Sequence, residues 1–201
     1  MARWEPNAAE RLARAALDLF SERGYDDTTV IDIAQRAGLG KSSFFRHFSD
    51  KREVLFGGAA MDELLTEAIA TAPPSLTALE AVGRALDAAG KEVFTSARRE
   101  TVLRRRAVIA ANPELQEREA LKSLSLTASM TKALESRGVP GLTARVAAEL
   151  GTLASAVAIE RWSQTANRSE FGVLARQALR DVQASVESCV AGNSTLGPAR
   201  T

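Results

Sequence analysis

Apolar residues recur at three- and four-residue spacing along most of the chain, and this periodicity constrains the fold more than any other feature. Near the start, four of them occupy positions i, i+4, i+7 and i+8 of one helical face: Leu12, Ala16, Leu19 and Phe20. Alanine, leucine, arginine and glutamate dominate, whereas runs of β-branched residues are few. Proline and glycine fall mostly at the expected helix ends. We therefore predict an all-α protein.

Capping signals divide the chain into short helices followed by long ones. Asn7 with Glu10, three residues on, forms a capping-box pair that predicts a first helix ending at Gly24. Thr29 is the predicted N-cap of a second helix, and a third short helix is expected over residues 41–48. Asp50 with Glu53 predicts a longer helix that ends before Pro73. The later helices are expected over residues 75–94, 98–110, 113–138, 142–166 and 169–190.

The composition excludes several classes of protein. With 45% hydrophobic and 25% charged residues, the chain is typical of a globular protein with a substantial core. One cysteine, Cys189, and one histidine, His47, are too few for an internal disulfide or a Cys/His zinc site. Nucleophilic catalysis needs a base beside the nucleophile, and neither inward carboxylate pairs nor glycine-rich phosphate loops are found. We therefore expect no enzyme, metal or cofactor.

Targeting signals are equally sparse. No uncharged run approaches the roughly 20 residues that span a bilayer, and the stretch between Glu149 and Glu160 is about half that length. The first six residues also lack the apolar segment of a secretory signal. We expect a cytoplasmic protein that does not enter a membrane, with a disordered tail over residues 192–201.

Local charge, rather than total charge, indicates a nucleic-acid partner. The chain has 26 basic and 25 acidic residues, so its net charge of +1 is uninformative. Within residues 36–52, five basic residues stand against one acidic residue, and 5 minus 1 gives +4. The basic residues are Arg36, Lys41, Arg46, Lys51 and Arg52, and the acidic one is Asp50.

The same segment is predicted to form a helix-turn-helix over residues 29–48. Small Ala34 and Ala37 let two short helices approach closely, and Gly38 permits a turn that a Cβ would disfavour. Phe44 and Phe48, four residues apart, should face inward. The outward positions of the second short helix can then read base edges in a major groove, with the Phe45 ring against a thymine methyl.

Phosphate contacts are expected on the flanks of this motif. The Thr28 and Thr29 hydroxyls mark one helix N-terminus, and Lys51 marks the start of the next. His47 can donate to a phosphate oxygen or pack locally, and both interpretations stay open. The DNA-binding candidates are Thr28, Thr29, Lys41, Ser42, Ser43, Phe45, Arg46, His47 and Lys51.

An ordered series of motifs in the first 55 residues strongly resembles the N-terminal DNA-binding domain of TetR-family bacterial transcriptional regulators. The series is Gly24-Tyr25, Thr28-Thr29-Val30, Ile33-Ala34, Ala37-Gly38-Leu39-Gly40-Lys41 and Phe44-Phe45-Arg46-His47-Phe48, with Lys51 and Leu55. Gly40 stands where the family commonly has a serine cap. Phe45 stands where it commonly has a tyrosine whose hydroxyl meets a phosphate.

The resemblance implies a divergent helical domain over residues 56–191 for ligand binding and dimerisation. The stretch from Arg104 to Glu119, with Trp162, resembles a subgroup described as binding acyl-CoA-like ligands. It implies Arg106 and Trp162 as ligand-binding candidates and a hydrophobic or acyl-CoA-like effector. Two other interpretations stand beside these: a solvated arginine face around residues 98–106, and a place for Trp162 in the core or at a dimer interface.

These observations predict a homodimeric, ligand-responsive repressor of a palindromic operator in double-stranded DNA. The alternative is a helical adaptor that binds a protein partner, which leaves the +4 segment unexplained. In the dimer, the helices over residues 142–190 pair with their symmetry mates. The candidate interface positions are Leu150, Leu153, Ala154, Val157, Leu174, Ala178 and Val182. The effector is expected within the helices of residues 56–138, coupled to DNA through the helix that starts at Asp50.

Overall fold

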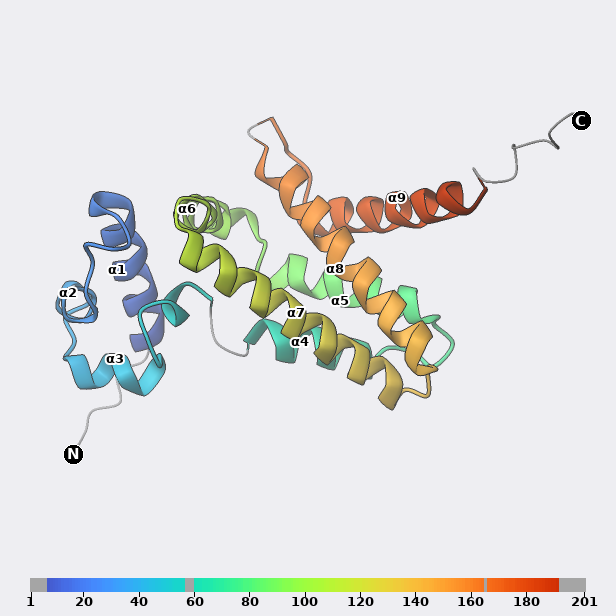
Figure 1. The fold of residues 1–201 in the computed structure, drawn as a ribbon, viewed down its shortest axis with the longest axis horizontal. Helices are drawn as coiled ribbons and strands as arrows, with labels where there is room; N and C mark the ends of the chain where they lie inside the picture. Colours follow the sequence, from blue (N-terminus) through green and yellow to red (C-terminus); the bar gives the residue numbers. More distant parts are fainter. Residues whose placement is uncertain (1–6, 57–59, 165, 192–201) are drawn as a thin grey trace, which may run out of the picture. The chain divides into compact units, whose positions relative to one another are not determined.

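Helices make up all the regular structure that we describe (Figure 1), which confirms the predicted fold class. The computed structural model describes residues 7–56, 60–164 and 166–191, and the predicted disordered tail lies outside these ranges. The short elements are α1 (Ala8–Arg23), α2 (Val30–Arg36), α3 (Lys41–His47) and a 3-10 turn, η1 (Glu53–Leu55). The later elements are α4 (Ala60–Ala70), α5 (Ala78–Glu92), η2 (Ser96–Arg98), α6 (Arg99–Ala110), α7 (Pro113–Ser136), α8 (Gly141–Ser163) and α9 (Phe171–Ala191).

Side-chain caps explain where several helices begin. The Thr29 hydroxyl accepts the Asp32 amide while the Asp32 carboxylate accepts the Thr29 amide, so both orphan donors are satisfied. Thr77 and Glu80 form the same reciprocal box at α5. At α7, the Asn112 side chain accepts the Leu115 amide at 3.2 Å and so caps the start of the helix.

One predicted cap, at Asn7, and one predicted capping box, of Asp50 with Glu53, are wrong. Asn7 adopts a left-handed conformation with φ 69° and makes no side-chain cap bond, because capping needs an extended backbone. Asp50 does accept the amides of Arg52 and Glu53, at 2.8 and 3.0 Å. The result is only the turn η1, however, and the next helix begins at Ala60. Glu53 does not complete a box, since its carboxylate binds Arg118 and Lys122.

The chain divides into two compact units, which differ from the predicted boundary at residue 55. The first combines the residues up to Met61 with Ala97–Leu124, and the second combines Asp62–Ser96 with the residues from Ser125 onward. We call them the N-terminal and the C-terminal unit. α6 and the first half of α7 therefore belong with α1, α2 and α3, and α7 continues from one unit into the other.

A single apolar core holds the N-terminal unit together. At its centre are three fully buried residues, one from each of α1, α2 and α3: Leu12, Ile33 and Phe44. Ile109 of α6 and Leu115 of α7 join the same cluster, at 2% and 0% exposure. The small helix-turn-helix is thus stabilised by apolar burial against residues distant in sequence.

In the C-terminal unit, α5, α8 and α9 pack through glycine and alanine. A Cβ added at Gly151 of α8 would lie 2.3 Å from Val82 Cγ1 of α5, so glycine is required at this crossing. A Cβ at Gly90 of α5 would lie 3.0 Å from the backbone nitrogen of Gly172 in α9. These three helices are therefore in close contact at these crossings.

One face of α8 is an exposed apolar stripe, whereas other residues of the same helix are buried. Leu142, Val146 and Leu153 are 78%, 49% and 52% exposed. By length and composition alone, α8 is also apolar enough to cross a membrane, which counting uncharged runs did not detect. Its other face packs on α5 and α9, which accounts for part of that composition. Four predicted interface positions are wrong because they are buried within one chain: Ala154, Leu174, Ala178 and Val182.

Candidate nucleic-acid interface

A tight turn joins α2 to α3 in the predicted helix-turn-helix. Gly38 has φ 68°, a left-handed conformation that glycine adopts without a steric penalty. The Leu39 amide donates to the Ala34 carbonyl at 2.8 Å, and the Gly38 amide donates to the Gln35 carbonyl at 2.9 Å. This pair of bonds is a Schellman motif, which ends α2 and turns the chain into α3.

α3 separates an inward from an outward face as the sequence predicts. Phe44 is completely buried, and its ring centroid lies 5.6 Å from that of half-buried Phe48. The outward face consists of exposed side chains, with Ser43 half-buried beside them: Lys41, Ser42, Phe45, Arg46 and His47. The structure therefore brings the predicted base-reading residues together on one short helix.

Two pairwise contacts organise the outward face of α3. The Lys41 ammonium lies 5.9 Å from the centroid of the Phe45 ring, on which it forms a cation–π contact. Arg46 donates from Nη2 to Ser43 Oγ at 2.9 Å. A guanidinium has five N–H donors, so Arg46 keeps donors for a second acceptor such as a guanine edge.

Thr28 is not available for the predicted phosphate contact. Its side chain is 1% exposed, and its hydroxyl donates to the Gly24 carbonyl at 2.8 Å. The Thr28 hydroxyl oxygen also accepts a hydrogen bond from Arg23 Nε at 3.4 Å. Thr28 thus closes the turn after α1. Thr29 is exposed, but its hydroxyl is engaged with Asp32.

Lys51 is half-buried rather than free at the start of a helix. Its ammonium donates to the Tyr25 carbonyl at 2.7 Å and lies 3.9 Å from the centroid of the Tyr25 ring. Burial lowers the pKa of Lys51 and raises the pKa of the Tyr25 phenol to about 12. Tyr25 is therefore neutral at physiological pH, and the lysine is held by a carbonyl and a ring face.

Part of the +4 segment is neutralised by acids from outside it. Arg36 of α2 makes a bidentate pair with Glu22 of α1, at 2.7 and 2.9 Å. Arg52 pairs with Asp50 and, at 3.2 Å, with Glu114 of α7. The cations of this segment without an acidic partner within ion-pair distance are therefore Lys41, Arg46 and Lys51, as far as the described residues show.

Sequence reasoning missed the contacts that attach α6 and α7 to the N-terminal unit. Arg104 of α6 pairs with Asp18 of α1 at 2.8 Å, and both side chains are about one-third exposed. Glu53 is 9% exposed and is bound by Arg118 and, at 3.0 Å, by Lys122. Burial alone would raise the pKa of Glu53, but the bonds from Arg118 and Lys122 outweigh it and lower the pKa.

The two ligand-binding candidates lie in different environments. Trp162 is 3% exposed and packs edge-on against Phe94 and Phe171, whose rings stack at 4.2 Å. This contact supports the core interpretation of Trp162. Arg106 is exposed rather than inward-facing. It lines a shallow cavity of about 330 Å³ at the corner of α6 and α7, together with Ile109, Ala110, Gln116 and Glu119.

Residues 12–57 match the family described as bacterial regulatory proteins, tetR family. The matched segment contains α2, the Schellman turn and α3, which are the elements that present the exposed basic face. Over these residues the chain is similar to the tetR family of bacterial regulatory proteins. Its match to the family explains why the motifs from Gly24 to Leu55 occur in a fixed order.

Named relatives resemble this TetR-family domain over short stretches. The HTH-type transcriptional regulator TcmR of Streptomyces glaucescens is 39% identical over 80 residues, which is 39% of this chain and 35% of TcmR. The negative transcriptional regulator IcaR of Staphylococcus aureus is 40% identical over 45 residues, or 22% of this chain and 24% of IcaR. The chain thus matches about a third or less of these relatives' length, and both are named as regulators.

A solved structure extends the likeness beyond the TetR-family domain. The transcriptional regulator FadR of Bacillus subtilis, in complex with stearoyl-CoA, has a TM-score of 0.54 and 19% identity. The match covers 86% of this chain and 96% of FadR. At this identity the comparison shows a shared fold, which includes the helices that follow the DNA-binding domain.

Proposed function

We propose that the protein is a cytoplasmic transcriptional regulator that binds a palindromic operator as a homodimer. The observation that carries this proposal is the outward face of α3, on which Lys41, Ser42, Phe45 and Arg46 are exposed together within a TetR-family domain. Such a helix has the length and chemistry to enter a major groove. The name of IcaR, a negative regulator, supports repression rather than activation.

The chemistry of α3 suits mixed base reading. Lys41 and Arg46 supply donors for the O6 and N7 acceptors of guanine. The Phe45 ring supplies an apolar surface for the 5-methyl group of thymine. Ser42 donates or accepts and therefore discriminates little by itself. His47 is exposed at the end of α3 beside the Phe48 ring, and in this proposal it donates to a phosphate.

Phosphates are held by the flanks of α3 in this proposal. The amides at the start of α2 that the Thr29–Asp32 capping box leaves unused are one site. Lys51 is the other phosphate-binding site, because its ammonium has three N–H donors and only one of them binds the Tyr25 carbonyl. These contacts fix the register of α3 without reading sequence.

The exposed stripe of α8 supports dimerisation. Leu142, Val146 and Leu153 lie at i, i+4 and i+11, and half-buried Leu150 and Val157 continue the same helical face. An apolar face of this kind is costly in water and is favourable when a second copy covers it. A two-fold dimer would present two copies of α3 to successive major grooves, roughly 34 Å apart.

The effector in this proposal is a hydrophobic or acyl-CoA-like small molecule bound in the C-terminal unit. The stearoyl-CoA named with FadR supports this ligand class. Because α5, α8 and α9 are closed by glycine contacts, we place the ligand nearer α4 and α7. To release DNA, the effector must favour the non-binding state, and a tenfold bias corresponds to about 1.4 kcal/mol of differential affinity.

Selection from random duplex DNA with the purified protein, near physiological salt, tests this proposal. A regulator of this kind retains a palindromic consensus whose half-sites are one helical turn, or a small multiple of it, apart. Retention without a consensus would contradict sequence-specific binding. It would leave only a basic surface that binds DNA without reading its sequence.

A further inference from the structure

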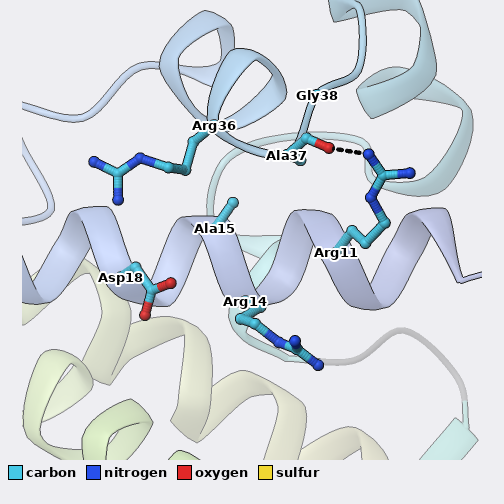
Figure 2. Close-up of a pocket in the computed structure, with 7 residues that line it drawn as sticks. All are labelled: Arg11, Arg14, Ala15, Asp18, Arg36, Ala37 and Gly38. Carbon is cyan, nitrogen blue, oxygen red and sulfur yellow. Dashed lines mark hydrogen bonds between the residues drawn. The ribbon is translucent and has the colours of Figure 1, made fainter.

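A guanidinium from α1 reaches the turn that precedes the recognition helix. Arg11 donates from Nη2 to the Ala37 carbonyl at 2.5 Å, across 26 residues of sequence. Figure 2 shows Arg11 rising from α1 toward the end of α2, with this bond drawn beside Gly38. A Cβ at Gly38 would lie 3.0 Å from the same nitrogen, so the turn is shaped to admit the arginine.

The bond satisfies a carbonyl that α2 itself cannot satisfy. The last four carbonyls of a helix lack intrahelical partners. The Schellman bonds use those of Ala34 and Gln35, and the Ala37 amide takes that of Ile33. The Ala37 carbonyl, at the C-cap, points outward and accepts from Arg11 instead. A charged donor at this position also complements the negative end of the helix dipole.

α3 has no comparable side-chain support at its own start. Its N-cap is Gly40, which makes no side-chain cap bond. A serine there would fix the first turn of α3 locally. In this chain, the polar tie on the turn between α2 and α3 comes instead from α1. Below the turn, Phe44, Ala34 and Ala37 pack in the apolar core, so Arg11 adds a polar contact to a turn that is already held by apolar burial.

We propose that Arg11 is a positioning residue that fixes the direction of α3 by holding the Ala37 carbonyl. This inference rests on the proposed function and adds a residue outside the DNA-reading helix to its specificity. Arg11 is exposed and borders an open cavity of about 390 Å³, so its removal leaves no void in the core. The cavity is lined by Arg11, Arg14, Ala15, Asp18, Arg36, Ala37 and Gly38 (Figure 2).

Three variants test the role of Arg11. Arg11→Met keeps the aliphatic stem but removes the donor, and Arg11→Lys restores one donor. Arg14→Met is the matched control, because Arg14 lines the same cavity and its ion pair, at 3.7 Å, is with Glu10 of its own helix. Affinity is measured for the duplex that the wild-type protein selects and for a scrambled duplex, over a series of salt concentrations. Amide hydrogen exchange is measured without DNA.

Arg11→Met should lower affinity for the selected duplex about tenfold, while the scrambled duplex and the salt slope stay unchanged. Arg11→Lys should recover most of the loss, and Arg14→Met should match the wild type. In free protein, exchange at the amides of residues 38–44 should rise several-fold in Arg11→Met, and exchange in the core of α1 should not. This exchange readout needs no operator and detects the positioning role in a variant of reduced stability.

Several results would overturn the assignment. Equal losses for both duplexes, or a salt slope lower by about 0.9, would make Arg11 a phosphate contact instead. If the Arg11→Met variant has the same amide exchange and DNA affinity as the wild type, the bond from Arg11 to the Ala37 carbonyl is dispensable. If the wild-type protein selects no sequence at all, the proposed function fails, whereas selective wild-type binding with an unaffected Arg11→Met variant refutes only this inference.

Discussion

At the residue scale, side chains on α3 and those flanking it differ in how well sequence predicts them. Helical periodicity alone places Phe44 inward and Lys41, Phe45 and Arg46 outward, and the structure has them so. Thr28 and Lys51 are different, because their partners are the carbonyls of Gly24 and Tyr25. Only the folded chain brings Tyr25 to Lys51, across 26 residues, so no local pattern reveals this contact.

Phe45 yields a prediction specific to one methyl group. Replacing the thymine that it contacts by deoxyuridine should weaken wild-type binding about fourfold, since a buried methyl is worth about 0.8 kcal/mol. The Phe45→Ala variant should bind the thymine and deoxyuridine duplexes equally. Fluorescence anisotropy with each thymine of the selected site replaced in turn measures both. A Phe45→Ala variant that still discriminates at every position would contradict the contact.

At the scale of elements, capping chemistry predicts helix starts well where the cap is local. Thr29 with Asp32 and Asn112 with Leu115 act within three residues, so the sequence contains all that is needed. The helix predicted after Asp50 is not formed as such. Glu53, the residue that would complete its box, is bound by Arg118 across 65 residues. The Glu53 carboxylate therefore binds Arg118 instead of the Asp50 amide that the capping box requires.

The buried Glu53 carboxylate makes stability depend on pH. Because the folded pKa of Glu53 is lowered, its contribution is present above the unfolded pKa and is lost as pH falls through the folded pKa. Glu53→Gln should therefore reduce the free energy of unfolding by about 1–2 kcal/mol at pH 7, with the difference vanishing at acidic pH. Urea unfolding from pH 7 to pH 3 measures this.

Glu114→Gln is the control for Glu53, because Glu114 is 53% exposed in its pair with Arg52. It should change stability by less than about 1 kcal/mol at any pH. A pH-independent effect of Glu53→Gln would contradict the ion network with Arg118 and Lys122.

The α5–α8 crossing gives a second prediction for elements. Alanine normally favours a helix over glycine by about 1 kcal/mol. Gly151→Ala should nevertheless destabilise the protein by about 1–3 kcal/mol, because its Cβ would meet Val82 at 2.3 Å. Adding Val82→Ala should recover part of this loss. Stabilisation by Gly151→Ala alone, in urea unfolding, would show that the crossing has room to spare.

At the scale of the whole molecule, sequence predicts the fold class and the DNA-binding segment but not the division into units. Residues 97–124 look in sequence like part of a larger C-terminal domain. Ile109 and Leu115 instead complete the core of the N-terminal unit, where α1, α2 and α3 alone would bury little apolar surface. The exposed stripe of α8, which we propose as the dimer interface, was also only partly predictable. Helical spacing identifies Leu153, whereas burial inside one chain removes Ala154 and Leu174.

Dimerisation is tested by charging the α8 stripe. Val146→Glu with Leu153→Glu should convert the protein to monomers and weaken binding to a palindromic duplex far more than to a single half-site. The control is Leu121→Glu with Leu124→Glu, which charges two leucines of α7 that are 51% and 65% exposed. Sedimentation velocity gives the mass of each. Monomers from the α7 pair and dimers from the α8 pair would place the interface elsewhere.

The central claim is that the outward face of α3 reads sequence. The most direct measurement is random-duplex selection run in parallel on the wild-type protein and on a Lys41→Ala, Arg46→Ala double variant, at one salt concentration. We predict a palindromic consensus for the wild type and none for the variant, with helicity and dimer mass unchanged. The same consensus from both proteins would contradict the claim, because the sequence would then be read by another surface.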